Sequence, residues 1–579
     1  MKRTFHHPLP FGAETQPDGH TLFRLWAPSV AAVLLRLPEG DAPMHTEPGG
    51  WHRLAASAPA GTPYSFVLPD GLAVPDPAAR QQAGGVHGPS LVGDPAGFAW
   101  QHPDWLGRPW HEAVLYECHA GLMGGFKGVQ ARLPGLARMG ITAVELMPIA
   151  GVPGSRNWGY DGVLPYAPDG ALGSPDELKA LIDAAHGLGL MMLLDVVYNH
   201  FGPDGAYIHA YAKPFFRDDS HTPWGAAIDF RRPEVRDYFT QNALFWLDEY
   251  RFDGLRFDAV HAISEESFLI DMAGAIRDQT EGRQIHLVLE HEGNRAALLC
   301  IDGAERLYDA QWADDLHHCL HVLLTHDTEG YYKDFREATP LLARCLAEGF
   351  AYQGDPTPRT GLGRGEPSGH LPPTAFVICL QNHDQIGNRA MGERLTVLAR
   401  PQALRAATAL LLLSPFIPML FMGEEWASTT PFLFFTDHNE DLAELVRTGR
   451  RAEFKSFAAF QDKSSRNQIP DPNAPATFER SRPEATDPGH ADWLAALLAV
   501  RRTHIMPGIP GCRSGGAEVL RPGAVRAAWT LGGGKTLTIA LNLGDATIET
   551  TPADRTMLFA SAGATPAMLP PDSITVTLG

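Results

Sequence analysis

The sequence contains few cysteines, no long apolar run and a deficit of positive charge. None of its six cysteines forms a CxxC pair, and several lie in apolar segments, so we expect buried free thiols rather than disulfides or zinc ligands. The six are Cys118, Cys300, Cys319, Cys345, Cys379 and Cys512. The start, MKRTFHHPLPFGAE, has no apolar stretch typical of a secretion signal, and no run approaches the ~20 apolar residues of a membrane span. These absences predict a cytoplasmic protein.

Negative charge exceeds positive charge along the chain. Its 47 Lys and Arg against 67 Asp and Glu give a formal net charge of -20 over 579 residues. Such a surplus repels the phosphates of nucleic acids and the headgroups of anionic lipids. We therefore expect a neutral or cationic ligand and no nucleic acid or membrane partner. Separately, we expect a monomer or a homodimer.

The pattern of apolar and polar residues changes twice along the chain, which predicts three domains. Residues 1–105 hold short alternating runs such as TLFRLWAP and GTPYSFVL between Gly and Pro turns, which is typical of a β-sandwich. In residues 106–505 apolar runs alternate with amphipathic helical stretches, which indicates βα units and a parallel sheet. Residues 506–579 return to strand-like runs such as TLTIALNL and SITVTL, so we expect a second β-sandwich there.

Eight apolar runs lie in the central region. They are AVLYECHA (113–120), ITAVELMPI (141–149), LMMLLDVVY (190–198), FDGLRFDAV (252–260), IHLVLE (285–290), AQWADDL (310–316), AFVICLQNHD (375–384) and IPMLFMGEE (417–425). Eight strands that alternate with helices predict a (β/α)8 TIM barrel. The sixth run is the weakest, because it is short and polar.

Polar side chains stand at the ends of several of these runs. The active site of such a barrel lies at the carboxyl ends of its strands, where these side chains would meet. They are Asp195, Asn199 and His200 after the third run, Arg256 and Asp258 in the fourth, Glu290 in the fifth, Asn382, His383 and Asp384 in the seventh, and Glu424 and Glu425 in the eighth.

Arg256 and Asp258 share one face of their strand, because side chains alternate along a strand. A carboxylate inside a barrel needs a cationic neighbour to stay ionised, and it can then act as a nucleophile. Glu290, behind the apolar run IHLVL, is expected in a less polar setting from which it could deliver a proton. Two carboxyl groups in these roles cleave glycosidic bonds without a redox cofactor or a catalytic metal. Taken singly, Asp258 would more often be part of a buried ion pair, and Glu290 a cap or a solvated acid.

Four segments resemble the α-amylase family of glycoside hydrolases: DVVYNH (195–200), DGLRFDAV (253–260), the strand that ends in Glu290, and QNHD (381–384). The resemblance implies that Asp258 is the nucleophile, Glu290 the general acid/base and Asp384 the stabiliser of the transition state. It also implies that Arg256 orients Asp258, that His200 and His383 bind sugar hydroxyls, and that Tyr160, in NWGYDG, is an aromatic platform.

Further segments, DAQWADDLHH, NHDQIGNR and FMGEEWASTTPFLFFTDH, are most similar to family members that release trehalose from the end of a maltooligosaccharide. The implied reaction retains the anomer, cuts the α-1,4 bond next to the trehalose unit and needs neither cofactor nor metal. The expected substrate-binding residues are Tyr160, Asp161, His200, Arg256, His261, Trp312, Asp314, Asp315, His317, His318, Asn382, His383, Gln385, Glu424 and Trp426.

Alternatives remain open from the sequence. Branching and debranching enzymes of the family use the same acids, and a non-catalytic glucan-binding protein is a third possibility. The segment WADDLHH could also simply begin the sixth helix, with Asp315 as its cap.

Overall fold

The computed structural model describes residues 4–222, 225–299, 307–550 and 555–579. Eight parallel strands close into a barrel whose order in space is their order along the chain. The strands are β10 (Leu115–Cys118), β11 (Ala143–Leu146), β14 (Met191–Val196), β17 (Gly254–Phe257), β18 (His286–Leu289), β19 (Ala310–Trp312), β20 (Phe376–Cys379) and β21 (Ile417–Phe421). The TIM barrel expected from the sequence is confirmed.

Each strand is shorter than the apolar run that predicted it. The run 252–260 is a strand only over Gly254–Phe257, so Asp258 lies in the loop that follows the strand. In the sixth run the strand ends at Trp312, and the helix α6 begins at Asp314 with Ala313 at its cap position. The interpretation of Asp315 as a helix cap is therefore wrong, because Asp315 is the second residue of the helix.

Helices surround the barrel and complete its βα units. The longer ones are α1 (Gly125–Met139), α2 (Pro175–Gly187), α4 (Pro233–Asp248), α5 (Glu266–Gln279), α6 (Asp314–Thr325), α7 (Ala338–Glu348), α10 (Pro401–Leu413) and α14 (His490–Val500). Shorter helices are α3 (Ile208–Tyr211), α8 (His383–Gly387) and α9 (Leu395–Leu398). The start of α2 shows how sequence fixes a boundary: the Ser174 hydroxyl accepts from the Glu177 N–H, and the Glu177 carboxylate accepts from the Ser174 N–H.

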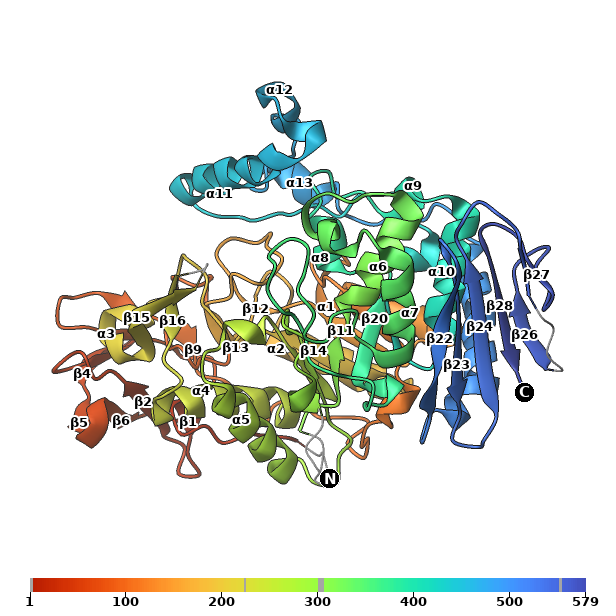
Figure 1. Ribbon diagram of the computed structural model, residues 1–579. Helices are drawn as coiled ribbons and strands as arrows, with labels where there is room; N and C mark the ends of the chain where they lie inside the picture. The colour runs from red at the N-terminus through yellow and green to blue at the C-terminus, as the bar shows by residue number, and fades with distance from the viewer. Residues whose placement is uncertain (1–3, 223–224, 300–306, 551–554) are drawn as a thin grey trace.

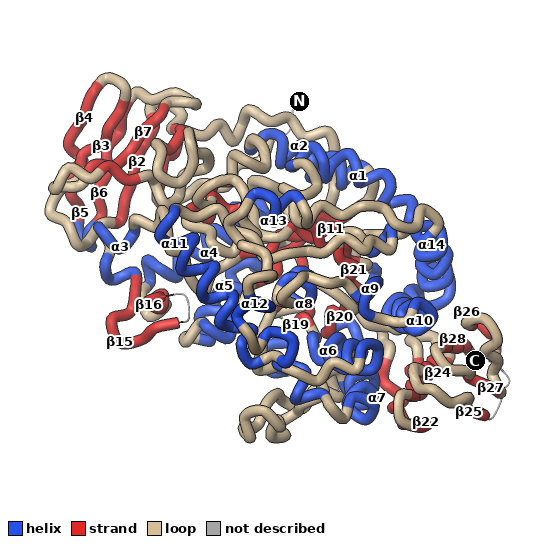
Figure 2. Tube along the Cα trace, turned by 90° about the horizontal axis from the view of Figure 1, so that it is seen from above, coloured by secondary structure: helices blue, strands red, loops and turns tan. Residues whose placement is uncertain are grey.

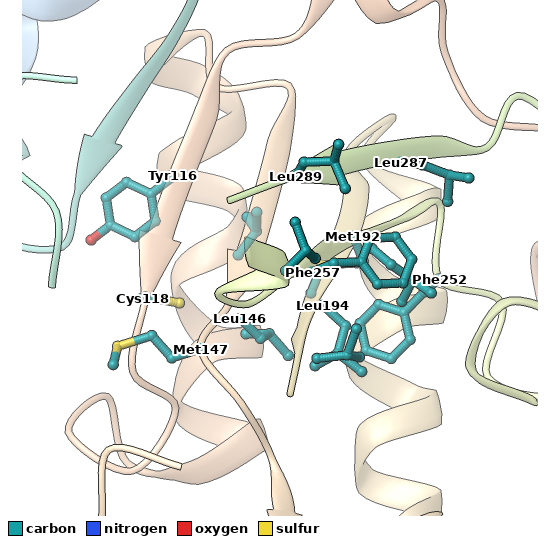
Figure 3. Close-up of a cluster of buried hydrophobic side chains, with 14 of the residues drawn as sticks. Tyr116, Cys118, Leu146, Met147, Met192, Leu194, Phe252, Phe257, Leu287 and Leu289 are labelled. Carbon is teal, nitrogen blue, oxygen red and sulfur yellow. The ribbon is translucent and has the colours of Figure 1, made fainter. Parts of the chain in front are cut away.

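Alternation along the strands divides the core into two layers. Along β14, Met191 and Leu193 belong to a cluster with inward-facing residues of the other strands, whereas Met192 and Leu194 belong to the cluster between strands and helices. Figure 3 shows part of that outer cluster, with Met192 and Leu194 close to Phe257. The inner cluster fills the barrel interior below the carboxyl ends of the strands. The inward-pointing polar side chains therefore gather at that end of the barrel.

Two antiparallel sheets precede the barrel. One contains β1 (Gly12–Thr15), β2 (Thr21–Trp26), β6 (Trp51–Ala56) and β5 (His45–Glu47). The other contains β4 (Gly40–Pro43), β3 (Leu34–Leu37), β7 (Pro63–Val67) and β8 (Ala73–Val74), and β9 (Ser90–Leu91) pairs with β7. Phe23 of the first sheet and Tyr64 of the second pack with ring centroids 4.9 Å apart, which places the sheets face to face as a sandwich.

A third group of strands follows the barrel. Its five-stranded sheet has the order β22 (Arg513–Arg521), β23 (Ala524–Thr530), β24 (Thr536–Asn542), β28 (Ser573–Leu578) and β26 (Thr556–Ala560). A small sheet of β25 (Ile548–Glu549) and β27 (Met568–Leu569) packs on it through buried Ile548 and Leu569. Figures 1 and 2 show the N-terminal and C-terminal sheets on opposite sides of the barrel.

A buried arginine joins the N-terminal sheets to the barrel. Nη1 of Arg80 lies 2.7 Å from Oε1 of Glu14 in β1, and Nε lies 3.2 Å from Oε2 of Glu249, which follows α4. The Arg80 side chain is 6% exposed, and those of Glu14 and Glu249 are 8% and 2% exposed. Because ion pairs this deep lose their hydration, each charge depends on the other two.

A helical excursion after β21 lies over the carboxyl end of the barrel. It contains α11 (Glu440–Glu453), the 3-10 turns η9 (Phe454–Ser456) and η10 (Ala458–Phe460), α12 (Lys463–Arg466) and α13 (Pro475–Glu479). Figure 1 shows α11 and α12 above the end of the barrel where α8 lies, and the view from above in Figure 2 agrees. A second excursion, between β14 and α4, carries the hairpin of β15 (Phe216–Thr222) and β16 (Gly225–Ile228).

Five of the six cysteines are buried free thiols, as expected from the sequence, and Cys300 lies outside the described residues. Within the described parts of the chain, no helix is both long enough and apolar enough to cross a bilayer.

Candidate active site

One guanidinium group organises the carboxyl end of the barrel. Arg256 is fully buried and donates from Nη1 to Oδ2 of Asp195 over 2.6 Å and to Oδ1 of Asp258 over 3.0 Å. From Nη2 it donates to Oε2 of Glu290 over 2.7 Å. The ring of Trp312 lies 4.2 Å from the guanidinium carbon. Asp195 and Arg256 are register partners across β14 and β17, so strand pairing itself sets this arrangement.

Backbone and amide donors complete the surroundings of the two acids. Nδ2 of Asn199 donates to Oδ2 of Asp258 over 2.9 Å. The N–H of Ala259, a residue in the left-handed region (φ 40), donates to Oε2 of Glu290 over 2.8 Å. Glu290 therefore lies in a more polar setting than its apolar strand led us to expect, because the neighbouring strand β17 and the loop after it present a cation and an N–H to it.

Asp384 belongs to α8, which Asn382 caps by accepting from the N–H of Gln385. The preceding residue, His383, is buried, and its Nδ1 pairs with Oε1 of Glu117. Burial alone would lower the pKa of His383, but the carboxylates of Asp384 and Glu117 outweigh it and raise the pKa to about 9. The imidazolium links Asp384, 3.5 Å from its Nε2, to the first barrel strand.

Tyr160 covers the site from the side of β11. Its ring stacks on that of His383 with centroids 4.9 Å apart, and its hydroxyl donates to Oδ2 of Asp195 over 2.6 Å. His200 lies near Asp161, and burial lowers its pKa to about 4 although Asp161 acts in the opposite direction. A neutral imidazole can both donate and accept, which is what neighbouring sugar hydroxyls require.

A cavity of about 410 Å³ opens beside the acids. The expected site residues that line it are Glu290, Asp384, His261, Trp312, Asp314, His318 and Gln385. Asp258, Tyr160 and His200 do not line it. The cavity therefore lies on the side of the proposed proton donor, Glu290, rather than on the side of Asp258.

Asp314, at the start of α6, stands out among the carboxyl groups of the cavity. Burial raises its pKa to about 7, and the negative charges of Glu290 and Asp384 add to that shift. Near neutral pH this carboxyl group can carry a proton and donate a hydrogen bond to a ligand.

Five expected binding residues face other parts of the protein. Asp315 accepts from Nδ2 of Asn294 over 3.0 Å and His317 pairs with the Leu380 carbonyl over 2.6 Å, so both have partners inside the fold. Glu424 accepts from the Phe421 N–H, and the ring of Trp426 carries the guanidinium of Arg132 at 4.8 Å. The fifth, Asn382, is the cap of α8. These residues are placed to support the site, and none of them lines the cavity.

The sequence analysis missed two acids inside the barrel and the outer part of the cavity. The two acids, Glu117 and Glu145, lie at matching register positions on β10 and β11. A third acid, Asp195, was noted at a strand end but given no role. Burial raises the pKa of Glu145 well above its ordinary value. A charged residue at an inward position of a strand was the available signal. The aromatic residues Tyr331, Phe335 and Phe457 of the cavity gave no comparable signal, because they come from irregular segments.

No group of three or more His, Cys, Asp or Glu side chains in the described ranges is arranged to hold a metal ion.

A closed eight-stranded barrel with acids clustered at its carboxyl end defines a glycoside hydrolase of the α-amylase type. The alpha amylase catalytic domain model matches residues 94–224, and a domain of unknown function, DUF3459, matches residues 512–576. A curated relative, the malto-oligosyltrehalose trehalohydrolase of Deinococcus radiodurans, is 41% identical over 82% of this chain and 78% of its own. The same enzyme of Rhizobium sp. (strain M-11) is 38% identical over 85% and 87%. The chain belongs to the family of malto-oligosyltrehalose trehalohydrolases.

Solved structures agree on the fold. The crystal structure of a Salmonella typhimurium protein described as an alpha amylase superposes with a TM-score of 0.94 at 43% identity, covering 99% of this chain and 100% of that chain. A curated branching enzyme of Jannaschia sp. is 32% identical over only 47% of this chain and 44% of its own, so the branching alternative has the weaker support.

Proposed function

We propose that this protein hydrolyses the α-1,4-glucosidic bond next to the trehalose end of maltooligosyltrehalose, releasing trehalose and a maltooligosaccharide with retention of the anomer. The observation that carries the proposal is the hydrogen bonding of Asp258 and Glu290 to adjacent nitrogens of Arg256, beside an open cavity on the Glu290 side. Two carboxyl groups held this way supply the nucleophile and the acid/base of a retaining mechanism.

In the first step Oδ of Asp258 attacks the anomeric carbon of the sugar being cleaved. The bond from that carbon to the bridging oxygen breaks, and a protonated Glu290 delivers its proton to this oxygen, so trehalose leaves as a neutral molecule. Arg256 and Ala259 both donate to Oε2 of Glu290, so Oε1 is the oxygen placed to transfer the proton. The maltooligosaccharide remains bound to Asp258 as an ester.

In the second step water takes the place of trehalose. Glu290 now accepts a proton from the water as its oxygen attacks the anomeric carbon, and the ester bond to Asp258 breaks. Attack on opposite faces in the two steps restores the starting anomer. Arg256 stabilises Asp258 as it regains its negative charge.

Asp384, Tyr160 and His200 serve the sugar ring that is attacked. We assign Asp384 to the hydroxyls of that ring, where bonds that tighten as positive charge develops lower the barrier. The ring of Tyr160, fixed by its bond to Asp195 and its stacking on His383, offers an apolar face to the sugar. The cavity takes the leaving trehalose, with Trp312, Asp314, His318 and Gln385 on its lining.

Product analysis tests the proposal directly. Purified protein is incubated with maltooligosyltrehalose and, separately, with amylose, and the products are separated by anion-exchange chromatography. Trehalose with a maltooligosaccharide shortened by two glucose units supports the proposal. New α-1,6 branches, or cleavage of α-1,6 bonds in a branched glucan without release of trehalose, would instead identify a branching or debranching enzyme.

We further infer that the protein acts in the cytoplasm as a monomer or a homodimer. The five buried free thiols fit a reducing compartment, and the net charge of -20 disfavours anionic surfaces. Cell fractionation with an antibody, together with light scattering of the purified protein, tests both parts. Recovery from an oxidising extracellular fraction, or a larger assembly, would contradict the inference.

A further inference from the structure

Two segments far apart in the sequence form facing walls of the cavity. The turn η6 (Gly330–Phe335), between α6 and α7, contributes Tyr331, Tyr332 and Phe335. The excursion after β21 contributes Phe454 from η9, Phe460 from η10, and Phe457 from between the two turns. Neither segment carries a proposed catalytic acid. Their aromatic side chains therefore form part of the cavity wall and set its shape.

The two walls touch. The Glu329 carboxylate accepts from the Ala458 N–H, at 3.3 Å to Oε1 and 3.2 Å to Oε2. Next to this bond the ring of Phe457 packs on Gly330, so closely that a methyl group at Gly330 would lie 2.7 Å from Cζ of the ring. Gly330 also has a positive φ of 54°. The turn therefore needs glycine for two reasons, its conformation and the space for Phe457.

The excursion is also tied to the element that carries Asp384. Arg450 of α11 donates from Nη2 to the carbonyls of Gly387 and Arg389, at 2.7 and 3.1 Å, at the end of α8. Its guanidinium lies 4.7 Å from the ring of Phe454. The excursion is thus bonded to the end of α8 through Arg450 and to Glu329 through the Ala458 N–H, so it spans the cavity.

We propose that Phe457 is a specificity-determining residue that closes the leaving-group cavity, and that Glu329 is the positioning residue that holds it there. Closure at this contact limits the leaving group to two sugar rings. The inference rests on the proposed function, because it assumes that the leaving group occupies the cavity beside Glu290.

Size and chemistry support the closure. The volume of about 410 Å³ is near the lower end of the ~300–1,000 Å³ of small-molecule pockets, which suits a compact disaccharide better than an extended chain. A third ring on the leaving side would have to pass the contact between Gly330 and Phe457. Aromatic faces at this boundary give the second ring an apolar surface to pack on.

The test measures leaving-group length. Maltoheptaose carrying an isotope label at its reducing end is cut by wild type, Phe457→Ala and Glu329→Ala, and mass spectrometry gives the length of the labelled fragment. We expect a labelled disaccharide from wild type and labelled trisaccharides and longer fragments from both variants. In parallel, the ratio of kcat/KM for maltooligosyltrehalose to that for maltoheptaose should fall roughly 10-fold or more in both variants.

Leu445→Ala is the matched control. Leu445 lies on α11, is 67% exposed and does not line the cavity, so this variant should cut like wild type. Unchanged fragment lengths in folded Phe457→Ala and Glu329→Ala would overturn the proposal. Should Phe457→Ala fail to fold, Glu329→Ala alone tests the proposal, because that substitution removes the hydrogen bond to the Ala458 N–H and no core side chain. Absence of trehalose release by wild type would refute the proposed function instead, whereas fragment length on maltoheptaose still reports on closure.

Discussion

Arg256 and Glu290 are joined by a hydrogen bond of 2.7 Å between Nη2 and Oε2, although Arg256 lies on β17 and Glu290 follows β18. The same guanidinium holds Asp258 through Nη1, so one buried cation sets the positions of both proposed reacting groups. A change at Arg256 should therefore alter stability and catalysis together, whereas a change at either acid should alter catalysis first.

Replacing Arg256 with Met should cost about 3–5 kcal/mol of unfolding free energy, because Asp195, only 1% exposed, would lose the cation that offsets the burial of its carboxyl group. Urea titration followed by circular dichroism measures the change. Arg231→Met, which removes a half-exposed arginine from its pair with Asp229, serves as the control and should change stability little. Equal stability of the two variants would contradict the role given to Arg256.

Asp258→Asn should lower kcat on maltooligosyltrehalose by on the order of 10³-fold or more, because the amide cannot form the ester intermediate. Binding should persist, since the cavity lies on the other side of the site. Turnover is measured as trehalose release and binding by calorimetry with the same substrate. Survival of near-normal turnover would exclude Asp258 as the nucleophile.

Glu290→Gln should also lose trehalose release, because it lacks the proton donor and base. This defect can be distinguished experimentally from the loss of the nucleophile. A glycosyl fluoride needs no proton on its leaving group, and azide needs no base to attack the intermediate. We therefore expect α-maltosyl fluoride with azide to restore product formation in Glu290→Gln and not in Asp258→Asn. The restored product should be a glycosyl azide, identified by mass spectrometry. Rescue of both variants, or of neither, would count against the separate roles of the two acids.

The pairing of His383 with Glu117 predicts a loss of stability in alkali. Since the pKa of His383 is about 9 in the fold and 6.5 ordinarily, its protonated form contributes stability fully below pH 6.5, and this contribution is lost as pH rises through about 9. In Glu117→Gln the loss should begin at lower pH. Urea unfolding from pH ~6 to ~10 measures the effect. Glu112→Gln, at the half-exposed partner of Arg108, should leave the alkaline limb unchanged.

The barrel could be predicted from the sequence because its signals are local. The eight apolar runs and the polar residues that end them are readable without any knowledge of packing. Asp258 and Glu290 directly follow β17 and β18, and Asp384 lies in the short helix α8 that follows β20. The predicted strands were too long, because apolar side chains continue beyond the last residue that hydrogen-bonds to a neighbouring strand.

The outer site could not be predicted in the same way. Phe457 and Gly330 meet through an excursion whose position over the barrel depends on Arg450 reaching two backbone carbonyls, and no periodic pattern encodes such a bond. His317 and Asp315 show the opposite case. Their polar side chains suggested ligand contacts, and in the structure they hydrogen-bond to the Leu380 carbonyl and the Asn294 amide and do not line the cavity.

The salt-bridged junction at Arg80 has a consequence for the architecture as a whole. A module that is merely tethered can be deleted, and the remainder keeps its shape. Here, deletion of the first 105 residues would strand the Glu249 carboxylate in the barrel wall with the more distant Lys179 ammonium, at 3.9 Å, as its remaining cation. The leading sandwich is thus an integral part of the catalytic body, and a shortened chain should be recovered as insoluble material.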